Sequence, residues 1–296
     1  MTQARLIPSV TGETLESPVW SHAERCLYLI DIPARELLRY TPDRDAVKRW
    51  PLPSEPGALA LCEGGGLLVA LRTGIFRFDT ATRTLTHVAD PPYNPDRTRF
   101  NDGRCDAQGR FWIGSIYEPR DRAEAAFYRL DTDGTLQRVF DGVTTANGLA
   151  FSPDGRTGYC ADTPARKVWA FDLDAQGHPS ERRLYIDLQA ANIDGRPDGA
   201  AVDSEGCYWL ALIDSGRIGR FDPQGRLLQT VELPVRWPTC PCFGGDDLRT
   251  LYVANLRTGR KPEQLAQCPA AGTLVAVEVD VAGLPERTAA IGPDSF

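Results

Sequence analysis

The sequence predicts an all-β fold, a six-bladed β-propeller whose four-stranded blades surround a central channel. Short runs rich in aromatic and β-branched residues recur along the chain, as expected of strands. The pattern repeats six times, in repeats that begin at residues 16, 57, 101, 147, 198 and about 241. This spacing is typical of a four-stranded propeller blade, and we expect residues 1–296 to form a single domain.

The second strand of each repeat has the clearest strand character. It is predicted at 27–30, 67–70, 111–114, 158–161, 207–210 and 251–254. Glycine-containing turns precede four of these strands, at 63–66, 106–109, 152–155 and 203–206, and glycine supplies the positive φ that a tight hairpin needs. Third strands are predicted at 75–79, 126–131, 167–172 and 217–222, and a fourth follows the third, for example at 136–140.

The two ends of the ring are expected to close on each other. The N-terminal run Ala4-Arg5-Leu6-Ile7 is predicted to supply one strand of the last blade. No long amphipathic helix interrupts the repeats, and the best helical candidate, 262–267, is very short. Because a closed propeller needs no partner for stability, a monomer is the expected state.

Composition and charge exclude some classes of partner. The chain has 33 basic and 40 acidic residues, a net charge of -7, and no basic stripe of the kind that nucleic-acid binding requires. No apolar run is long enough to cross a bilayer, so we expect no membrane association. The first six residues do not resemble a signal peptide, which predicts a cytoplasmic protein.

The reactive side chains of the sequence do not form a nucleophilic or thiolate site. Cys240 and Cys242 are the only closely spaced pair among eight cysteines, and no second pair or histidine cluster accompanies them. Buried, reduced thiols are therefore the better interpretation. The three histidines stand in polar, turn-like sequence, and no Gly-x-Ser-x-Gly motif is present. A Ser-His-Asp hydrolase is not expected.

Four repeats begin with an oxygen-bearing side chain at the same point, ahead of the first apolar run: Glu16, Asn101, Asn147 and Asp198. The repeats at 57 and 241 offer no such residue. Inner strands line the channel of a propeller, so these four side chains should converge at one mouth. Each Asn-Gly or Asp-Gly alone is more typical of an ordinary turn. Glu16 decides between the interpretations, because no turn requires a glutamate there.

The chemistry of such a cluster favours a hard cation. All its donors are oxygens, which suit a divalent ion such as calcium, magnesium or manganese. The carboxylates of Glu16 and Asp198 would neutralise a dication, and an asparagine carbonyl would add coordination without further charge. With about three protein ligands, positions would remain for water and substrate, as a catalytic metal ion requires.

The motifs that carry these residues resemble those of the SMP-30/gluconolactonase family, the regucalcin-like proteins. They are Glu16-Ser17-Pro18-Val19-Trp20, Arg99-Phe100-Asn101-Asp102-Gly103, Asn147-Gly148-Leu149, Pro197-Asp198-Gly199 and Cys242-Phe243-Gly244-Gly245. The resemblance covers essentially the whole chain, with the motifs in order. It implies a six-bladed propeller that binds one divalent metal ion in its channel and hydrolyses sugar lactones to aldonic acids.

The resemblance also implies roles for individual residues. The metal ligands map onto Glu16, Asn147 and Asp198, and the ion could be calcium, magnesium, manganese, zinc or iron(II). The substrate contacts map onto Arg99 and Asn101. Glu118 is the nearest match to a further acidic substrate contact, although the segment around it departs from the family pattern.

The mechanism implied by the resemblance is metal-assisted attack of water on the lactone carbonyl. Calcium or magnesium acidifies water less than zinc does, so a base should help, and Asp198 is the candidate for that role.

Two other functions remain open from the sequence. One is a non-catalytic calcium-binding or interaction propeller, since this fold hosts many functions. The other is a propeller hydrolase of other esters. A further hypothesis concerns Arg120 and Arg122, which could meet an acidic sugar lactone at the channel mouth, although a solvated charged loop is the simpler interpretation.

Overall fold

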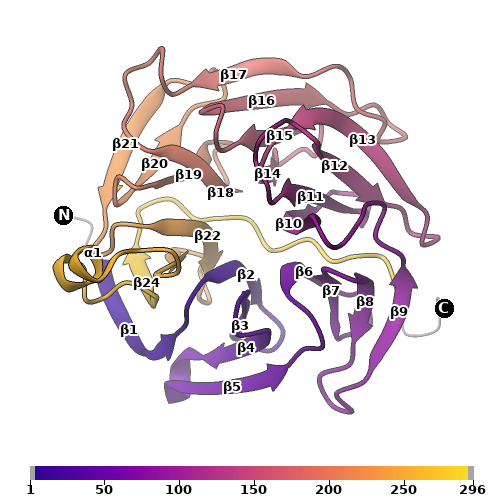
Figure 1. Cartoon of the computed structure of the whole chain (residues 1–296), viewed down its shortest axis with the longest axis horizontal. Helices are drawn as coiled ribbons and strands as arrows, with labels where there is room; N and C mark the ends of the chain where they lie inside the picture. Colours follow the sequence, from indigo (N-terminus) through magenta and orange to yellow (C-terminus); the bar gives the residue numbers. More distant parts are fainter. Residues whose placement is uncertain (1–3, 293–296) are drawn as a thin grey trace.

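The computed structural model describes residues 4–292 and contains six four-stranded antiparallel sheets arranged as blades around a central channel (Figure 1). The predicted six-bladed propeller is confirmed. The second strands begin and end within three residues of their predicted positions, because the aromatic and branched runs that identified them are buried along almost their whole length. Among residues 4–292, no helix has the length and apolar character needed to cross a lipid bilayer.

The strands of each blade follow one another from the channel outwards. The first three blades contain β2 (Leu15–Ser21), β3 (Cys26–Asp31), β4 (Glu36–Thr41) and β5 (Ala46–Pro51); β6 (Pro56–Leu61), β7 (Leu67–Leu71), β8 (Gly74–Phe78) and β9 (Leu85–Ala89); and β10 (Thr98–Cys105), β11 (Phe111–Tyr117), β12 (Ala125–Leu130) and β13 (Leu136–Val143). The next two contain β14 (Ala146–Phe151), β15 (Thr157–Asp162), β16 (Lys167–Asp172) and β17 (Arg183–Asp187); and β18 (Arg196–Val202), β19 (Tyr208–Ile213), β20 (Arg217–Phe221) and β21 (Leu227–Glu232). The last blade contains β22 (Pro238–Gly244), β23 (Thr250–Asn255), β24 (Thr273–Glu278) and β1 (Ala4–Thr11).

The ring closes as the sequence predicts. The N-terminal strand β1 pairs with β24 in antiparallel register, with Ala4 opposite Val277 and Ile7 opposite Leu274. The last blade therefore joins both ends of the chain. The short helix α1 (Pro262–Gln267) lies between β23 and β24, at the position of the weak helical candidate, and a 3-10 turn follows β4 at Pro42–Arg44.

The hydrophobic core lies between the blades. Each pair of adjacent blades shares one cluster of buried side chains. Between the third and fourth blades, for example, Trp112 stacks on Phe171 at 5.3 Å and meets Phe151 edge-on at 5.7 Å. Because every blade is packed against two neighbours, the positions of the inner strands around the channel are fixed by the whole ring.

A repeated hydrogen-bond pattern holds the predicted turns. In the third blade, Asp106 accepts the backbone N–H groups of Gln108 and Arg110 with one carboxylate oxygen, and the other oxygen accepts Trp112 Nε1–H at 2.7 Å. The same pattern recurs in the fifth blade, where Asp203 accepts Trp209 Nε1–H at 2.8 Å. Such a turn therefore links the end of an inner strand to the core.

The six inner strands run in the same direction along the channel, and each has a β-bulge near its beginning. In three of them the residue at the bulge has a left-handed φ, 47° at Ser17, 49° at Asp102 and 67° at Gly148. A bulge changes the direction of nearby side chains. In β2, β10 and β14 the bulge directly follows a predicted site residue (Glu16, Asn101 and Asn147), and in β18 it includes Asp198.

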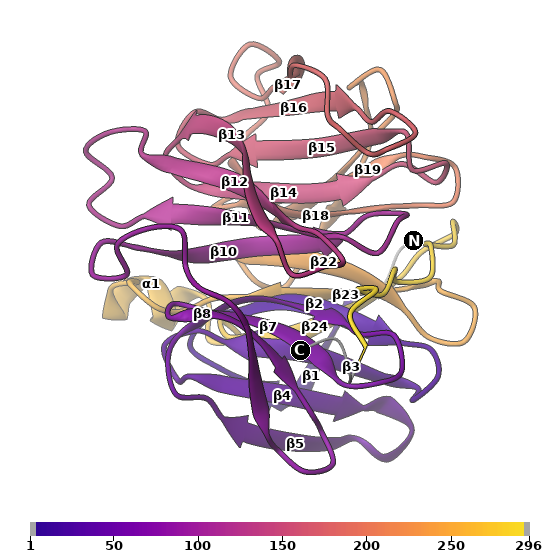
Figure 2. The same ribbon diagram turned by 90° about the vertical axis from the view of Figure 1, so that its right-hand side faces the viewer.

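The C-terminal segment, residues 281–292, crosses the opposite mouth of the channel (Figures 1 and 2). Its backbone bonds to the hairpin turns of four blades, through Gly283 N–H to Leu248 O, Ala282 O to Ser204 N–H, Ala290 N–H to Gly109 O and Ala289 O to Glu63 N–H. Figure 2 shows this segment at one end of the propeller and α1 at the other.

Candidate functional site

A cavity of about 150 Å³ opens at the mouth where the inner strands begin. A cavity of this size can hold a six-membered ring. Its walls include five of the six residues that the sequence singled out: Glu16, Arg99, Asn101, Asn147 and Asp198. They come from four different inner strands, so the repeated geometry brings together residues that are up to 182 positions apart in the chain.

A chain of hydrogen bonds fixes the two amides. Asn101 Oδ1 accepts from Arg99 Nη1 at 3.0 Å, and its Nδ2 donates to Asn147 Oδ1 at 2.8 Å. Asn147 Nδ2 in turn donates to Thr163 Oγ1 at 2.8 Å, while the Thr163 hydroxyl donates its single proton to Pro197 O. Thr163 can therefore only accept from Asn147, which leaves the Asn147 carbonyl oxygen turned toward Asn101 and the channel.

The two carboxyl groups of the cavity, those of Glu16 and Asp198, are buried, and burial disfavours their charged form. Burial raises the pKa of Glu16 to about 8, and the nearby Asp102 carboxylate adds to the effect, against the Ser17 N–H and Arg99. Burial also raises the pKa of Asp198 well above its usual value, and Glu16 and Asp102 raise it further. The Glu16 carboxylate thus acts directly on that of Asp198. A pair of buried like charges is costly unless a cation or a proton compensates it.

The donor set fits a hard divalent cation. Two carboxylates and one oriented amide oxygen face the same cavity, and a cation among them would offset the burial and the nearby negative charge that raise the pKa values of Glu16 and Asp198. No three His, Cys, Asp or Glu side chains in residues 4–292 come together as a metal site by themselves. The candidate set is consistent with that finding, since only two of its members are acidic.

Asp102 lies deeper in the channel and is occupied by backbone donors. Its carboxylate oxygens accept the N–H groups of Gly103 and Leu149, each at 2.9 Å. Burial raises its pKa, against these hydrogen bonds. No role for Asp102 was predicted from the sequence. In the structure it ties the bulge of β10 to β14 and adds negative potential beneath Glu16 and Asp198.

Glu118 stands behind Arg99 and is not part of the cavity wall. It accepts two hydrogen bonds from Arg72, both at 2.9 Å, and lies 3.5 Å from Arg99 Nε. The Arg72 hydrogen bonds lower its pKa against partial burial, and Arg99 lowers it further. Its expected contact with substrate stays a prediction.

Several residues of the cavity were not identified from the sequence. They are Thr14, Thr145, Thr163, Arg196 and Arg260. Three of them could have been predicted from their spacing, because residues two apart on a strand share one side. Thr14, Thr145 and Arg196 stand two positions before Glu16, Asn147 and Asp198.

The two arginines of the 118–124 loop, Arg120 and Arg122, lie in different surroundings. Arg120 lines the cavity. Arg122 turns away to Glu124 at 2.8 Å and to the hydroxyl of Tyr117 at 3.2 Å.

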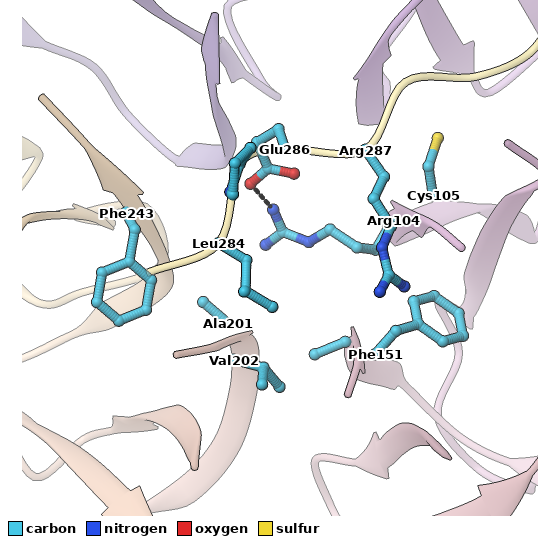
Figure 3. A pocket seen from close by; sticks show the side chains of 11 residues that line it. Arg104, Cys105, Phe151, Ala201, Val202, Phe243, Leu284, Glu286 and Arg287 are labelled. Atoms are coloured by element: carbon cyan, nitrogen blue, oxygen red, sulfur yellow. Dashed lines mark hydrogen bonds and ion pairs between the residues drawn. The ribbon is translucent and has the colours of Figure 1, made fainter. Parts of the chain in front are cut away.

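The far mouth of the channel is built differently (Figure 3). Arg104, at the end of β10, pairs with Glu286 of the C-terminal segment and donates to Ala200 O at 2.9 Å. The remaining cavity there is only about 50 Å³ and is walled by residues such as Phe151, Phe243 and Leu284. Cys240 and Cys242 are buried and free, as expected.

Comparisons with known proteins indicate the family to which this fold and these motifs belong. A sequence model described as the SMP-30/gluconolactonase/LRE-like region matches residues 14–257. The chain is 44% identical over 279 residues to the 6-deoxy-6-sulfogluconolactonase of Pseudomonas putida, with 94% of each chain covered. It is 37% identical over 279 residues to regucalcin of Danio rerio, with 93% of this chain and 94% of the relative covered. The crystal structure of regucalcin from Agrobacterium tumefaciens, a calcium-binding protein, matches with a TM-score of 0.92 at 28% identity and 97% coverage of both chains.

Proposed function

Because the chain belongs to the SMP-30/gluconolactonase/LRE-like family, we propose that it is a lactonase that hydrolyses a sugar lactone to the corresponding sugar acid with the help of one divalent metal ion. The 6-deoxy-6-sulfogluconolactonase relative, which the chain matches over nearly its whole length, supports the lactonase activity. The observation that carries the metal dependence is the buried pair Glu16 and Asp198, which face one cavity beside an oriented amide oxygen.

Glu16, Asn147 and Asp198 are the residues that would hold the ion. When bound there, a divalent cation would polarise the lactone carbonyl and favour the negative charge that develops on its oxygen. Thr163 acts indirectly, since it holds the Asn147 amide with its oxygen toward the channel. Oxygen donors select a class of ion, the hard or borderline divalent cations. Calcium, magnesium, manganese, zinc and iron(II) all belong to it.

The reaction opens the ring by addition of water. Water forms a bond to the carbonyl carbon, the bond from that carbon to the ring oxygen breaks, and the ring oxygen leaves as a hydroxyl. Asp198 would take the proton of the attacking water and return it to the ring oxygen, because it lines the cavity that would hold the lactone carbonyl. The product is an open-chain acid, which releases one proton at neutral pH.

Arg99 and Asn101 would orient the substrate. Both line the cavity, and the Arg99 guanidinium and the Asn101 amide can hold sugar hydroxyl groups or the carbonyl. Arg72 holds Glu118 with two hydrogen bonds at 2.9 Å, and Glu118 in turn lies 3.5 Å from Arg99 Nε. We propose that Glu118 positions Arg99; its own contact with the substrate stays a prediction.

Base titration of δ-gluconolactone tests the proposal. The protein should consume the lactone faster than the uncatalysed rate, lose this activity after treatment with a chelator, and regain it when a divalent ion is added back. Asp198→Asn should abolish turnover, whereas Glu263→Gln, an exposed carboxylate on α1, should not change it. Wild-type kcat in metal-loaded Asp198→Asn would show that Asp198 is not the base.

The same assay separates the two other functions. A non-catalytic calcium-binding propeller would bind the ion and leave the lactone untouched. A hydrolase of other esters would cleave a simple aryl ester in preference to the sugar lactone.

A further inference from the structure

The cavity has an outer layer of which the proposed hydrolysis uses only Arg99. Residues two apart on a strand lie about 6–7 Å apart on the same side. The residues two positions before Asn101 and Asp198 are Arg99 and Arg196, and both line the cavity nearer its opening. Arg120 and Arg260 complete the set of arginines in the wall. The inner layer therefore offers oxygen atoms, and the outer layer offers guanidinium groups.

Positive charge exceeds negative charge in this outer layer. Arg196 pairs with Asp214 at 2.7 Å, and Arg260 lies 3.7 Å from the same carboxylate. Two guanidinium groups thus share one carboxylate, and Arg236 approaches the backbone oxygen of Asp214 as well. The carboxylates of the inner layer would not neutralise this excess positive charge, because a bound divalent ion would already neutralise them. An anion would balance the outer layer.

Arg260 has the most unused binding capacity. Its guanidinium stacks on Trp237 at 5.0 Å, and its Nε is buried without a hydrogen-bond partner in the part of the chain that the structure describes. Burial lowers the pKa of Arg260; Asp214 opposes this, whereas Arg196 and Arg236 add to it. A buried donor without an acceptor, held on an aromatic ring beside other cations, is a position that an oxyanion would complete.

We propose that Arg260 and Arg196 bind an anionic group of the substrate, at the end of the sugar opposite the lactone carbonyl. The inference rests on the proposed function and narrows its substrate class to lactones of sugars that bear a carboxylate, phosphate or sulfonate. With the carbonyl at the inner layer, the last carbon of a six-carbon sugar extends toward the outer layer. Guanidinium groups recognise such oxyanions through paired N–H donors.

The selectivity between an anionic and a neutral lactone measures this contact. The probes are 6-phosphogluconolactone, its 6-sulfonate counterpart and δ-gluconolactone, and the quantity is the ratio of kcat/KM for anionic and neutral substrate. The wild-type ratio should be at least about 10. Arg260→Gln should lower it about 10- to 100-fold, as expected for loss of a charged hydrogen bond, and Arg260→Lys should keep part of it.

A second variant should act in the opposite direction. Asp214 has a left-handed φ of 77°, which asparagine tolerates well, so Asp214→Asn removes the competing charge with little strain. It should raise the ratio several-fold. Arg122→Gln and Arg257→Gln, exposed arginines outside the cavity wall, are matched controls and should leave the ratio unchanged.

Two results would overturn the inference while leaving the lactonase intact: a wild-type ratio near 1, or variants of Arg260 and Asp214 that shift the ratio in the same direction. Absence of turnover with every lactone would instead contradict the proposed function. In that case calorimetric binding of 6-phosphogluconate and gluconate still decides the question. The anion site is supported if the wild type binds 6-phosphogluconate more tightly than gluconate and Arg260→Gln loses this preference. Equal affinity of the wild type for the two ligands contradicts it.

Discussion

The two mouths of the channel are built from the same six strands and differ in almost every property. Where the inner strands begin, polar side chains surround a cavity of about 150 Å³. Where they end, the C-terminal segment 281–292 lies across the opening, and a cavity of about 50 Å³ remains among largely apolar side chains. The channel is therefore a pocket with one entrance, and water and substrate reach the carboxylates from that side.

The contrast shows how a repeated fold makes a single site. The bulges at the beginning of the inner strands aim one side chain from each of four blades at a common point, at a cost in buried like charge. At the far mouth the buried cation Arg104 has a carboxylate partner, Glu286. The open mouth thus holds buried carboxyl groups that a cation would compensate, whereas the buried charge at the far mouth is already paired.

The largest expected effect is at the open mouth. Glu16→Gln removes one of the two carboxylates, so kcat/KM for the lactone should fall on the order of 10³-fold. The metal-free variant should be at least as stable as the wild type, because the buried repulsion with Asp198 disappears. Steady-state kinetics and urea unfolding measure the two quantities. A variant that loses stability along with activity would indicate a structural role for Glu16.

A smaller effect, on the affinity for the metal ion, is expected from Thr163, which contacts the predicted ligand Asn147. Thr163→Val removes the acceptor that orients the Asn147 amide, so the affinity for the metal ion should fall about 10- to 100-fold. Thr163→Ser keeps the hydroxyl and should retain most of the affinity. Isothermal titration calorimetry with the metal alone reports this directly. Equal affinities for the valine and serine variants would show that the hydroxyl does not orient the amide.

At the far mouth the expected effect is on stability alone. Glu286→Gln leaves the buried Arg104 without its carboxylate and should lower the free energy of unfolding by about 2 kcal/mol. The kcat of the folded enzyme should not change, since Glu286 is distant from the open cavity. Glu263→Gln on α1 is the control for loss of a surface charge. A large drop in kcat for Glu286→Gln would contradict the separation of the two mouths.

The smallest effect concerns pH. The folded metal-free protein holds a proton on Glu16 up to a pKa of about 8, whereas the unfolded chain releases it near 4.5. The contribution of this group to stability is fully present below about 4.5 and is lost as the pH rises through 8. Thermal unfolding with chelator should show this decline, and Glu16→Gln should weaken it. A metal-free protein whose stability does not depend on Glu16 over this range would contradict the prediction.

Most of the fold was predictable because a propeller is a local pattern repeated. The second strands are buried on both faces, so their aromatic and branched residues identify them, as at 111–117 and 208–213. Closure by β1 was predictable because the last blade otherwise lacks a strand. The segment 281–292 was not predicted to cover the channel. It bonds to turns that are distant in the sequence, and its own residues carry no regular period.

The candidate site was predictable only where the repeats place a residue at an equivalent position. Glu16, Asn101, Asn147 and Asp198 could be aligned with one another, and the structure brings them to one cavity. Thr163 and Arg260 lie outside the inner strands, and their roles depend on contacts between blades. No local pattern indicates such contacts.

Anomalous diffraction from crystals grown with Mn²⁺ tests the central claim most directly. The account predicts one strong peak in the open mouth, about 2.0–2.6 Å from oxygen atoms of Glu16, Asn147 and Asp198. A peak elsewhere, or carboxylates of Glu16 and Asp198 too far apart to touch the same ion, would contradict it.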